Sequence, residues 1–171
     1  MQYKKVKPPM KIKTLIALLV VALFASQAFA NPAPNISFKT IRNTDIQLQN
    51  LQGKVVLITF WASNCKSCLA EIEDLKSLYQ DYHEQGLELF AISMYYDRPN
   101  YVVAASKYHK IPYDIVLDLR GGIAKAFGQV QLIPTTFLID TTGDIVYQTT
   151  GVFNLAEMQT RIQSLLNLPK G

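Results

Sequence analysis

The sequence predicts a mixed α/β fold, in which a largely parallel β-sheet is covered by helices on both faces. The first observation is that strand-like and helix-like apolar patterns alternate along the chain. The second is residues 55–61, a run of apolar and β-branched residues that is typical of a strand buried on both faces. The third is the turn-like segment Asp140–Gly143 between the strand patterns of residues 135–139 and 144–148, which predicts an antiparallel hairpin at the sheet edge.

The elements before the cysteines follow from local patterns. Residues 36–41 and 46–51 alternate apolar and polar residues around Arg42–Asp45, which predicts an N-terminal β-hairpin. Gly53 separates this hairpin from the buried strand over residues 55–61. An amphipathic helix is expected next, since apolar residues recur every three or four positions at Leu69, Ile72, Leu75, Tyr79 and Tyr82. Gly86 lies just past its end, where helices commonly terminate.

The second half of the chain repeats the alternation of strand and helix. Strands are expected over residues 87–92 and 113–117, which are short apolar runs. Helices are expected at residues 100–109, 123–127 and 155–168, and Gly128 and Pro134 separate the second of them from the late hairpin. The result is a central mixed sheet in a single domain over residues 36–168, preceded by a Pro-containing linker over residues 31–35.

Length, composition and charge limit the class of protein. The 171 residues suit one domain with a short appendage, and 49% hydrophobic against 18% charged residues indicates a folded core. The net charge of +4 comes from five lysines within the first thirteen residues. From Asn31 onward 12 basic residues face 13 acidic ones, so the folded part has no basic excess for a nucleic acid.

An export signal is expected in residues 1–30. The basic start is followed by the uncharged apolar run Thr14–Ala25 and by the small-x-small site Ala28-Phe29-Ala30, the order found in secretory signal peptides cleaved after such a site. The alternative is an uncleaved membrane anchor, because residues 26–30 extend the run to about 17 residues, near the lower limit for a membrane span. Either reading exports the domain, so we expect it in the periplasm, where disulfides persist.

The only two cysteines, Cys65 and Cys68, lie where the buried strand turns into a helix. A zinc site is one interpretation, but it needs four ligands, and His83 and His109 have no ligand-like spacing to the pair. A structural disulfide is a second, although closing so short a loop constrains the unfolded chain by only about 2 kcal/mol. We favour the third, a redox-active dithiol.

The position of the pair at a helix start supports this choice. Unpaired N–H groups and the helix dipole favour a thiolate at Cys65, and Lys66 adds positive charge nearby, which makes Cys65 the nucleophile. Cys68, one turn further along, is placed to attack the mixed disulfide that Cys65 forms with a partner. No cofactor and no metal are needed for this exchange.

Two segments carry a resemblance to a known family. Residues 61–68, from Trp61 to Cys68, together with Ile133–Asp140 downstream, resemble the thioredoxin superfamily, and more narrowly its exported thiol-disulfide oxidoreductases of the TlpA, ResA and CcmG type. The resemblance covers about residues 36–168 and implies a thioredoxin-like fold. It also implies that Trp61, Ile133 and Pro134 bind substrate, with Pro134 cis against the disulfide. Without the cysteines, a trans proline opening a strand would be the preferred interpretation of Pro134; with them, we favour cis.

The resemblance also assigns a role to Glu71, which matches the active-site glutamate of ResA-like proteins. Such a carboxylate can take or deliver the proton that moves as Cys68 becomes a nucleophile. The alternative is an acidic residue that merely favours the helix dipole in a first turn. Three positions depart from the family pattern: Asn64 replaces a second Trp, Ser67 replaces a Pro, and Thr59 replaces a buried Asp.

The resemblance implies a reductase of disulfides in exported proteins, apocytochrome c before haem attachment among them, with electrons from a membrane thiol donor. A disulfide-donating oxidase or isomerase is the alternative, because Lys66 and Ser67 between the cysteines tune the potential in a direction that the sequence does not give. A metallochaperone of the Sco type is a third, although that type spaces its cysteines by three and adds a histidine. A peroxidase is disfavoured, since Phe60 or Trp61 and Ala62 stand near where a Pro and a Thr normally precede its cysteine.

An aromatic cluster is left without a role by this interpretation. Tyr95, Tyr96 and Tyr101 follow the strand over residues 87–92, in or just after its loop. Single exposed aromatic residues are ordinary, but a cluster of three can form a docking surface for a partner protein.

Overall fold

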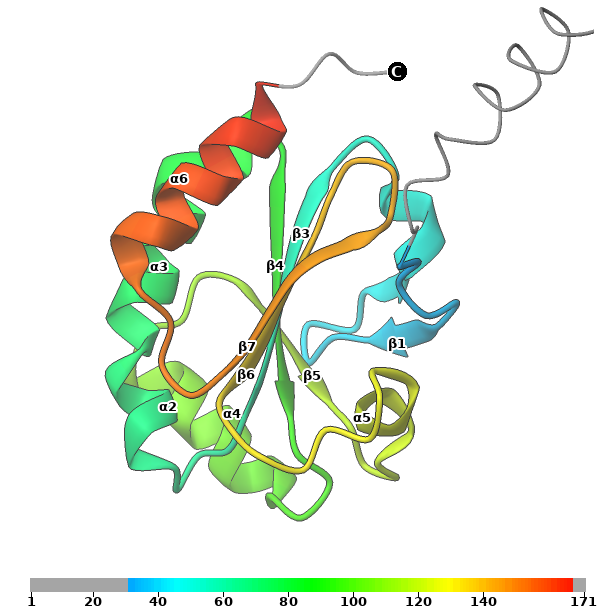
Figure 1. Ribbon diagram of the computed structural model, residues 1–171. Coiled ribbons are helices and arrows are strands. Elements are labelled where there is room, and N and C mark those ends of the chain that lie inside the picture. The colour runs from blue at the N-terminus through cyan, green and yellow to red at the C-terminus, as the bar shows by residue number, and fades with distance from the viewer. Residues whose placement is uncertain (1–30, 168–171) are drawn as a thin grey trace, which may run out of the picture. The chain divides into compact units, whose positions relative to one another are not determined.

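A five-stranded β-sheet forms the centre of the domain in the computed structural model, which describes residues 31–167 (Figure 1). The order across the sheet is β5-β4-β3-β6-β7. These strands are β3 (Val55–Trp61), β4 (Leu87–Ser93), β5 (Asp114–Leu117), β6 (Thr135–Ile139) and β7 (Ile145–Thr150). Strands β3, β4 and β5 are parallel, whereas β6 runs antiparallel to β3 and β7 antiparallel to β6. The predicted mixed α/β sheet with a late antiparallel hairpin is confirmed.

Strand β3 is central, with β4 on one side and β6 on the other. All of its residues are buried, as the continuous apolar run predicts. Because side chains alternate along a strand, its residues divide between two apolar clusters on the two faces of the sheet: Val55, Leu57 and Trp61 belong to one, and Val56, Ile58 and Phe60 to the other. The strand that precedes the cysteines is therefore enclosed by β4 and β6 at its edges and by an apolar cluster on each face.

Helices and 3-10 turns connect the strands, and α6 follows the last strand (Figure 1). They are α2 (Lys66–Ala70), α3 (Ile72–Tyr82), η2 (His83–Gln85), α4 (Pro99–Tyr108), α5 (Gly122–Ala126) and α6 (Leu155–Leu166). The first apolar cluster draws on α3, α4 and α6, and the second on α5 and the N-terminal strands, so both faces of the sheet are covered. Within residues 31–167, no helix has the length and apolar character needed to cross a membrane.

The N-terminal hairpin is shorter than predicted. Strands β1 (Ser37–Lys39) and β2 (Asp45–Gln47) pair antiparallel, but residues 48–51 form the 3-10 helix η1 (Leu48–Leu51) rather than the rest of a strand. In a 3-10 helix residues three apart share a face, so Leu48 and Leu51 both reach the apolar cluster. The alternating pattern over residues 46–51 is compatible with both structures, and packing selects the helix.

Two predictions on domain organisation concern residues outside the described range 31–167. The expected signal peptide or anchor, residues 1–30, lies outside it, and so does the end of the expected domain at residue 168. Helix α6 ends at Leu166, two residues before the predicted end at residue 168.

Candidate active site

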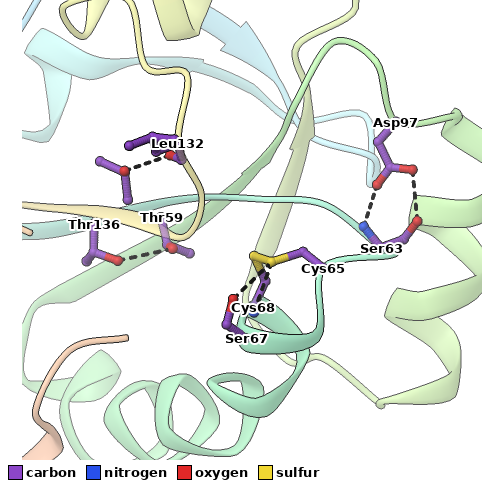
Figure 2. Close-up of a disulfide and its surroundings, with 9 residues drawn as sticks. Thr59, Ser63, Cys65, Ser67, Cys68, Asp97, Leu132 and Thr136 are labelled. Carbon is purple, nitrogen blue, oxygen red and sulfur yellow. Dashed lines mark hydrogen bonds between the residues drawn. A yellow bond between two sulfur atoms is a disulfide. The ribbon is translucent and has the colours of Figure 1, made fainter. Parts of the chain in front are cut away.

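Cys65 and Cys68 lie directly beyond the carboxyl end of β3, at the start of α2, and are joined by a disulfide (Figure 2). Cys65 is the N-cap residue of α2 and is half-buried, whereas only 3% of Cys68 is exposed. A partner therefore reaches the sulfur of Cys65 first. This order of access agrees with the predicted roles, in which Cys65 attacks and Cys68 resolves.

Two groups of the first turn contact the Cys65 sulfur. The backbone N–H of Cys68 donates to Cys65 Sγ at 3.2 Å, and Ser67 Oγ lies 3.3 Å from the same sulfur. After reduction, both groups can donate to a thiolate and stabilise it. The expected long helix is in fact broken, because α2 has five residues and ends before Glu71. The stabilisation at Cys65 thus comes from this one turn rather than from a long helix dipole.

Replacing Ser67 by alanine tests the contribution of the hydroxyl. One such hydrogen bond is worth about 0.5–1.5 kcal/mol, so we expect the reduced Ser67→Ala protein to react with iodoacetamide roughly twofold to tenfold more slowly at neutral pH. Ser164→Ala, on the exposed surface of α6, is the matched control and should react at the wild-type rate. An unchanged rate in Ser67→Ala would show that the hydroxyl does not stabilise the thiolate.

The segment before Cys65 is tied to the loop after β4. The carboxylate of Asp97 accepts hydrogen bonds from the backbone N–H of Ser63 and, at 2.8 Å, from Ser63 Oγ (Figure 2). Asp97 is not among the site residues predicted from the sequence, although a signal was present: the carboxyl ends of neighbouring parallel strands meet at one sheet edge. Asp97 thus helps to position the backbone that leads into the cysteine turn.

Glu71 lies between α2 and α3 and points into the protein, with 1% of its surface exposed. Its Oε1 accepts a hydrogen bond from the backbone N–H of Phe153 at 2.9 Å, from the segment before α6. Burial raises the pKa of Glu71 to about 7; the bond from Phe153 lowers it, and the charge of Asp74 adds a smaller increase. An acid with this pKa exchanges protons near neutral pH.

A small cavity of about 10 Å³ joins Glu71 to the buried cysteine. Cys68, Glu71, Trp61, Thr59 and Tyr113 are among the residues that line it. Glu71 is the one carboxylic acid in this lining, because the strand position that holds an Asp in thioredoxin is Thr59 here. The hydroxyl of Thr136 donates to that of Thr59 at 3.1 Å, deep in the core (Figure 2).

Trp61, predicted to bind substrate, is buried. Its ring lines the small cavity, and within the described residues its Nε1 has no hydrogen-bond partner. The structure thus places Trp61 beneath the cysteines, in contact with the protein interior, rather than on the surface that a partner polypeptide meets. The reason is its position at the end of the fully buried strand β3.

Ile133 and Pro134 come to the same sheet edge as the cysteines. Strand β6 begins at Thr135, which pairs with Phe60 near the end of β3, so the residues just before β6 lie alongside the start of the cysteine segment. The Ile133–Pro134 bond is cis, as the resemblance implies, and Ile133 packs in the same apolar cluster as Cys65. Within residues 31–167 neither backbone polar group of Ile133 takes part in a hydrogen bond.

The described residues hold no group of three or more His, Cys, Asp or Glu side chains that is arranged to bind a metal. The histidines considered for a zinc site are engaged elsewhere. His83 stacks on Tyr79 and contacts the carbonyl of Leu87, and His109 packs against Tyr108.

Taken together, the fold and the cysteine pair define a thioredoxin-like thiol-disulfide oxidoreductase. The family model for the AhpC/TSA family matches residues 29–148, and the chain belongs to this family. Similar proteins include the thiol-disulfide oxidoreductase ResA of Geobacillus thermodenitrificans, 27% identical over 166 residues that cover 90% of this chain and 94% of the relative. The ResA protein of Halalkalibacterium halodurans is 31% identical over 151 residues, which cover 81% and 84% of the two chains.

Solved structures agree. StoA from Bacillus subtilis aligns with a TM-score of 0.65 and 26% identity, over 75% of this chain and 98% of that one. A thioredoxin-family thiol:disulfide interchange protein from Chlorobium tepidum aligns with a TM-score of 0.75, over 83% of this chain and 100% of its own, and at 24% identity it supports the fold alone.

Proposed function

We propose that this oxidoreductase works as a reductase outside the cytoplasm: it reduces disulfides of exported proteins, apocytochrome c before haem attachment among them, and receives electrons from a membrane thiol donor. The observation that carries the direction is the buried carboxyl group of Glu71 beside Cys68. The location rests on the signal-like pattern of residues 1–30, and the substrate class on the resemblance to ResA-like and CcmG-like proteins.

The reaction proceeds by two exchanges. The thiolate of Cys65 attacks one sulfur of the partner disulfide, so that a mixed disulfide forms and the partner's other sulfur leaves as a thiolate. Cys68 then attacks Cys65 Sγ, which forms the Cys65–Cys68 disulfide and releases the partner's second sulfur. Two electrons pass from the protein dithiol to the partner, and the membrane donor returns them.

Glu71 handles the proton of the second exchange. Cys68 is buried as a thiol and must lose its proton before it attacks. Glu71 shares the small cavity with it and has a pKa of about 7, so its ionised form accepts that proton at neutral pH. When the membrane donor reduces the disulfide again, the proton returns to Cys68.

The same carboxylate supports the reducing direction. A disulfide becomes strongly oxidising when its reduced form is stabilised, as a thiolate is by nearby positive charge. The ionised carboxylate of Glu71 acts in the opposite sense at Cys68, because it disfavours a second negative charge beside it. At Cys65 the Ser67 hydroxyl and the Cys68 N–H act in the oxidising direction, so the proposed direction requires the effect of Glu71 at Cys68 to be the larger of the two.

The reduction potential of the Cys65–Cys68 couple tests the direction. The protein is equilibrated with glutathione buffers, and the fractions of dithiol and disulfide are measured after acid quenching and alkylation. We expect a potential near or below that of thioredoxin, about −270 mV. A value near that of DsbA, about −120 mV, would overturn the proposed direction and identify a disulfide donor instead.

A further inference from the structure

A surface cavity of about 370 Å³ lies next to the cysteine turn. It is lined by five residues of the two loops at this sheet edge and by one residue of α4: Ser63, Asn64, Tyr96, Asp97, Arg98 and, in the helix, Tyr101. Ser63 and Asn64 directly precede Cys65, so the cavity begins within two residues of the reactive sulfur. About half of each tyrosine side chain is exposed, 51% for Tyr96 and 52% for Tyr101. The proposed reaction leaves this cavity without a role.

Its charge is arranged asymmetrically. Asp97 directs its carboxylate at Ser63, where both of its oxygens accept hydrogen bonds. Arg98 is exposed, lies with its guanidinium carbon 5.8 Å from the ring centre of Tyr101, and makes no salt bridge or side-chain hydrogen bond with any residue in the range 31–167. The cavity therefore presents an exposed guanidinium beside the Tyr101 ring, without a salt-bridge partner among residues 31–167, while the carboxylate of Asp97 in the same lining is occupied by Ser63.

The surroundings have the same sign. Lys66 is exposed beside Cys65, and Arg120 and Lys125 line the neighbouring hollow together with Tyr95. Asp118, which precedes Arg120 in the loop before α5, is buried, and its carboxylate accepts hydrogen bonds from backbone N–H groups in the first turn of α5. This edge of the molecule thus complements negative charge, although residues 31–171 as a whole carry no positive excess.

We propose that this cavity is a specificity pocket for an acidic side chain close in sequence to the partner's reactive cysteine. Its carboxylate pairs with Arg98, since guanidinium groups bind carboxylates in a planar, bidentate manner, and its methylene groups pack on the exposed tyrosine rings. A peptide spans about 3.5 Å per residue, so a residue only a few positions from the partner's cysteine reaches a cavity that begins beside Cys65. The inference rests on the proposed function only in that the partner is a polypeptide that exchanges disulfides.

Matched peptides test the pocket. Disulfide-bonded peptides that differ only in carrying Glu or Gln two residues from the cysteine are reduced by the full reduced protein, and second-order rate constants are compared. We expect wild type to favour the Glu peptide roughly fivefold to tenfold at low salt, less at high salt, and Arg98→Gln to reduce this ratio to about one. Lys107→Gln, which removes a lysine from the far end of α4, should keep the wild-type ratio.

Equal rates for both peptides in wild type, or an unchanged ratio in Arg98→Gln, would overturn the proposal that this cavity selects an acidic side chain. The same peptides as dithiols, offered to the oxidised protein, separate this failure from a failure of the proposed direction. If the protein proves to be a disulfide donor, the preference for Glu appears in the oxidation rates, and the pocket is supported while the reductase proposal fails.

Discussion

Replacing Cys65 by serine is expected to abolish reduction of protein disulfides, whereas replacing Cys68 by serine is expected to trap the partner. In Cys65→Ser the accessible nucleophile is gone and the remaining thiol, Cys68, is buried, so the rate falls roughly 10³-fold or more. In Cys68→Ser the first exchange still occurs, but no thiol remains to release the partner, and the mixed disulfide through Cys65 accumulates.

Non-reducing electrophoresis and intact mass measure this difference. With a disulfide-bonded peptide as substrate, Cys68→Ser should gain the mass of one peptide, attached through a mixed disulfide to Cys65. This adduct should disappear on addition of dithiothreitol. The double variant, with both cysteines replaced by serine, is the control and should form no adduct. A stable adduct on Cys68 in the Cys65→Ser variant, formed as fast as the one on Cys65, would reverse the assigned roles.

Replacing Glu71 by glutamine is expected to remove a pH-dependent loss of stability. The pKa of Glu71 rises from 4.5, the ordinary value, to about 7 in the fold, so the folded protein favours the protonated acid. As the pH increases above about 4.5, the unfolded chain ionises first, and stability declines until the pH exceeds about 7. Each tenfold change in acidity corresponds to about 1.4 kcal/mol, so wild type loses about 3 kcal/mol across this window.

The oxidised proteins are used for this measurement, because their disulfide cannot titrate. Urea unfolding at pH 4.5 and pH 8 should show the difference in stability between Glu71→Gln and wild type growing by about 3 kcal/mol in favour of the variant. Glutamine keeps the oxygen that accepts from Phe153. Glu84→Gln, at an exposed position, is the matched control, and we expect it to stay within about 0.5 kcal/mol of wild type.

A second measurement on the same variant separates catalysis from stability. If Glu71 accepts the proton of Cys68, Glu71→Gln should release partner from the mixed disulfide roughly 10²-fold more slowly at pH 7, while Cys65 forms that disulfide at the normal rate. A stability change without this kinetic change would leave Glu71 as a buried structural acid and would remove it from the proton transfer.

The strands of the central sheet could be predicted because each buried strand is a short, continuous run of mostly apolar residues in the sequence. The run at β3 is apolar throughout since sheet neighbours lie on both sides and apolar clusters cover both faces. Predicted and observed bounds agree there and at β6, whereas the expected helix through Tyr82 is interrupted at Glu71. Periodic apolar residues continue through that break, so periodicity alone does not reveal it.

The fold class and the reactive pair could be predicted without the structure, because both depend on residues close together in the chain: local patterns for the strands and a two-residue spacing for Cys65 and Cys68. The surroundings of that pair depend on contacts between residues far apart in the chain. Glu71 is buried by contact with Phe153, 82 positions away, and Ser63 is held by Asp97, 34 positions away. Desolvation and charge pairing depend on such distant contacts. The raised pKa of Glu71 and the exposed guanidinium of Arg98, which has no salt-bridge partner among residues 31–167, could therefore be found only in the folded structure.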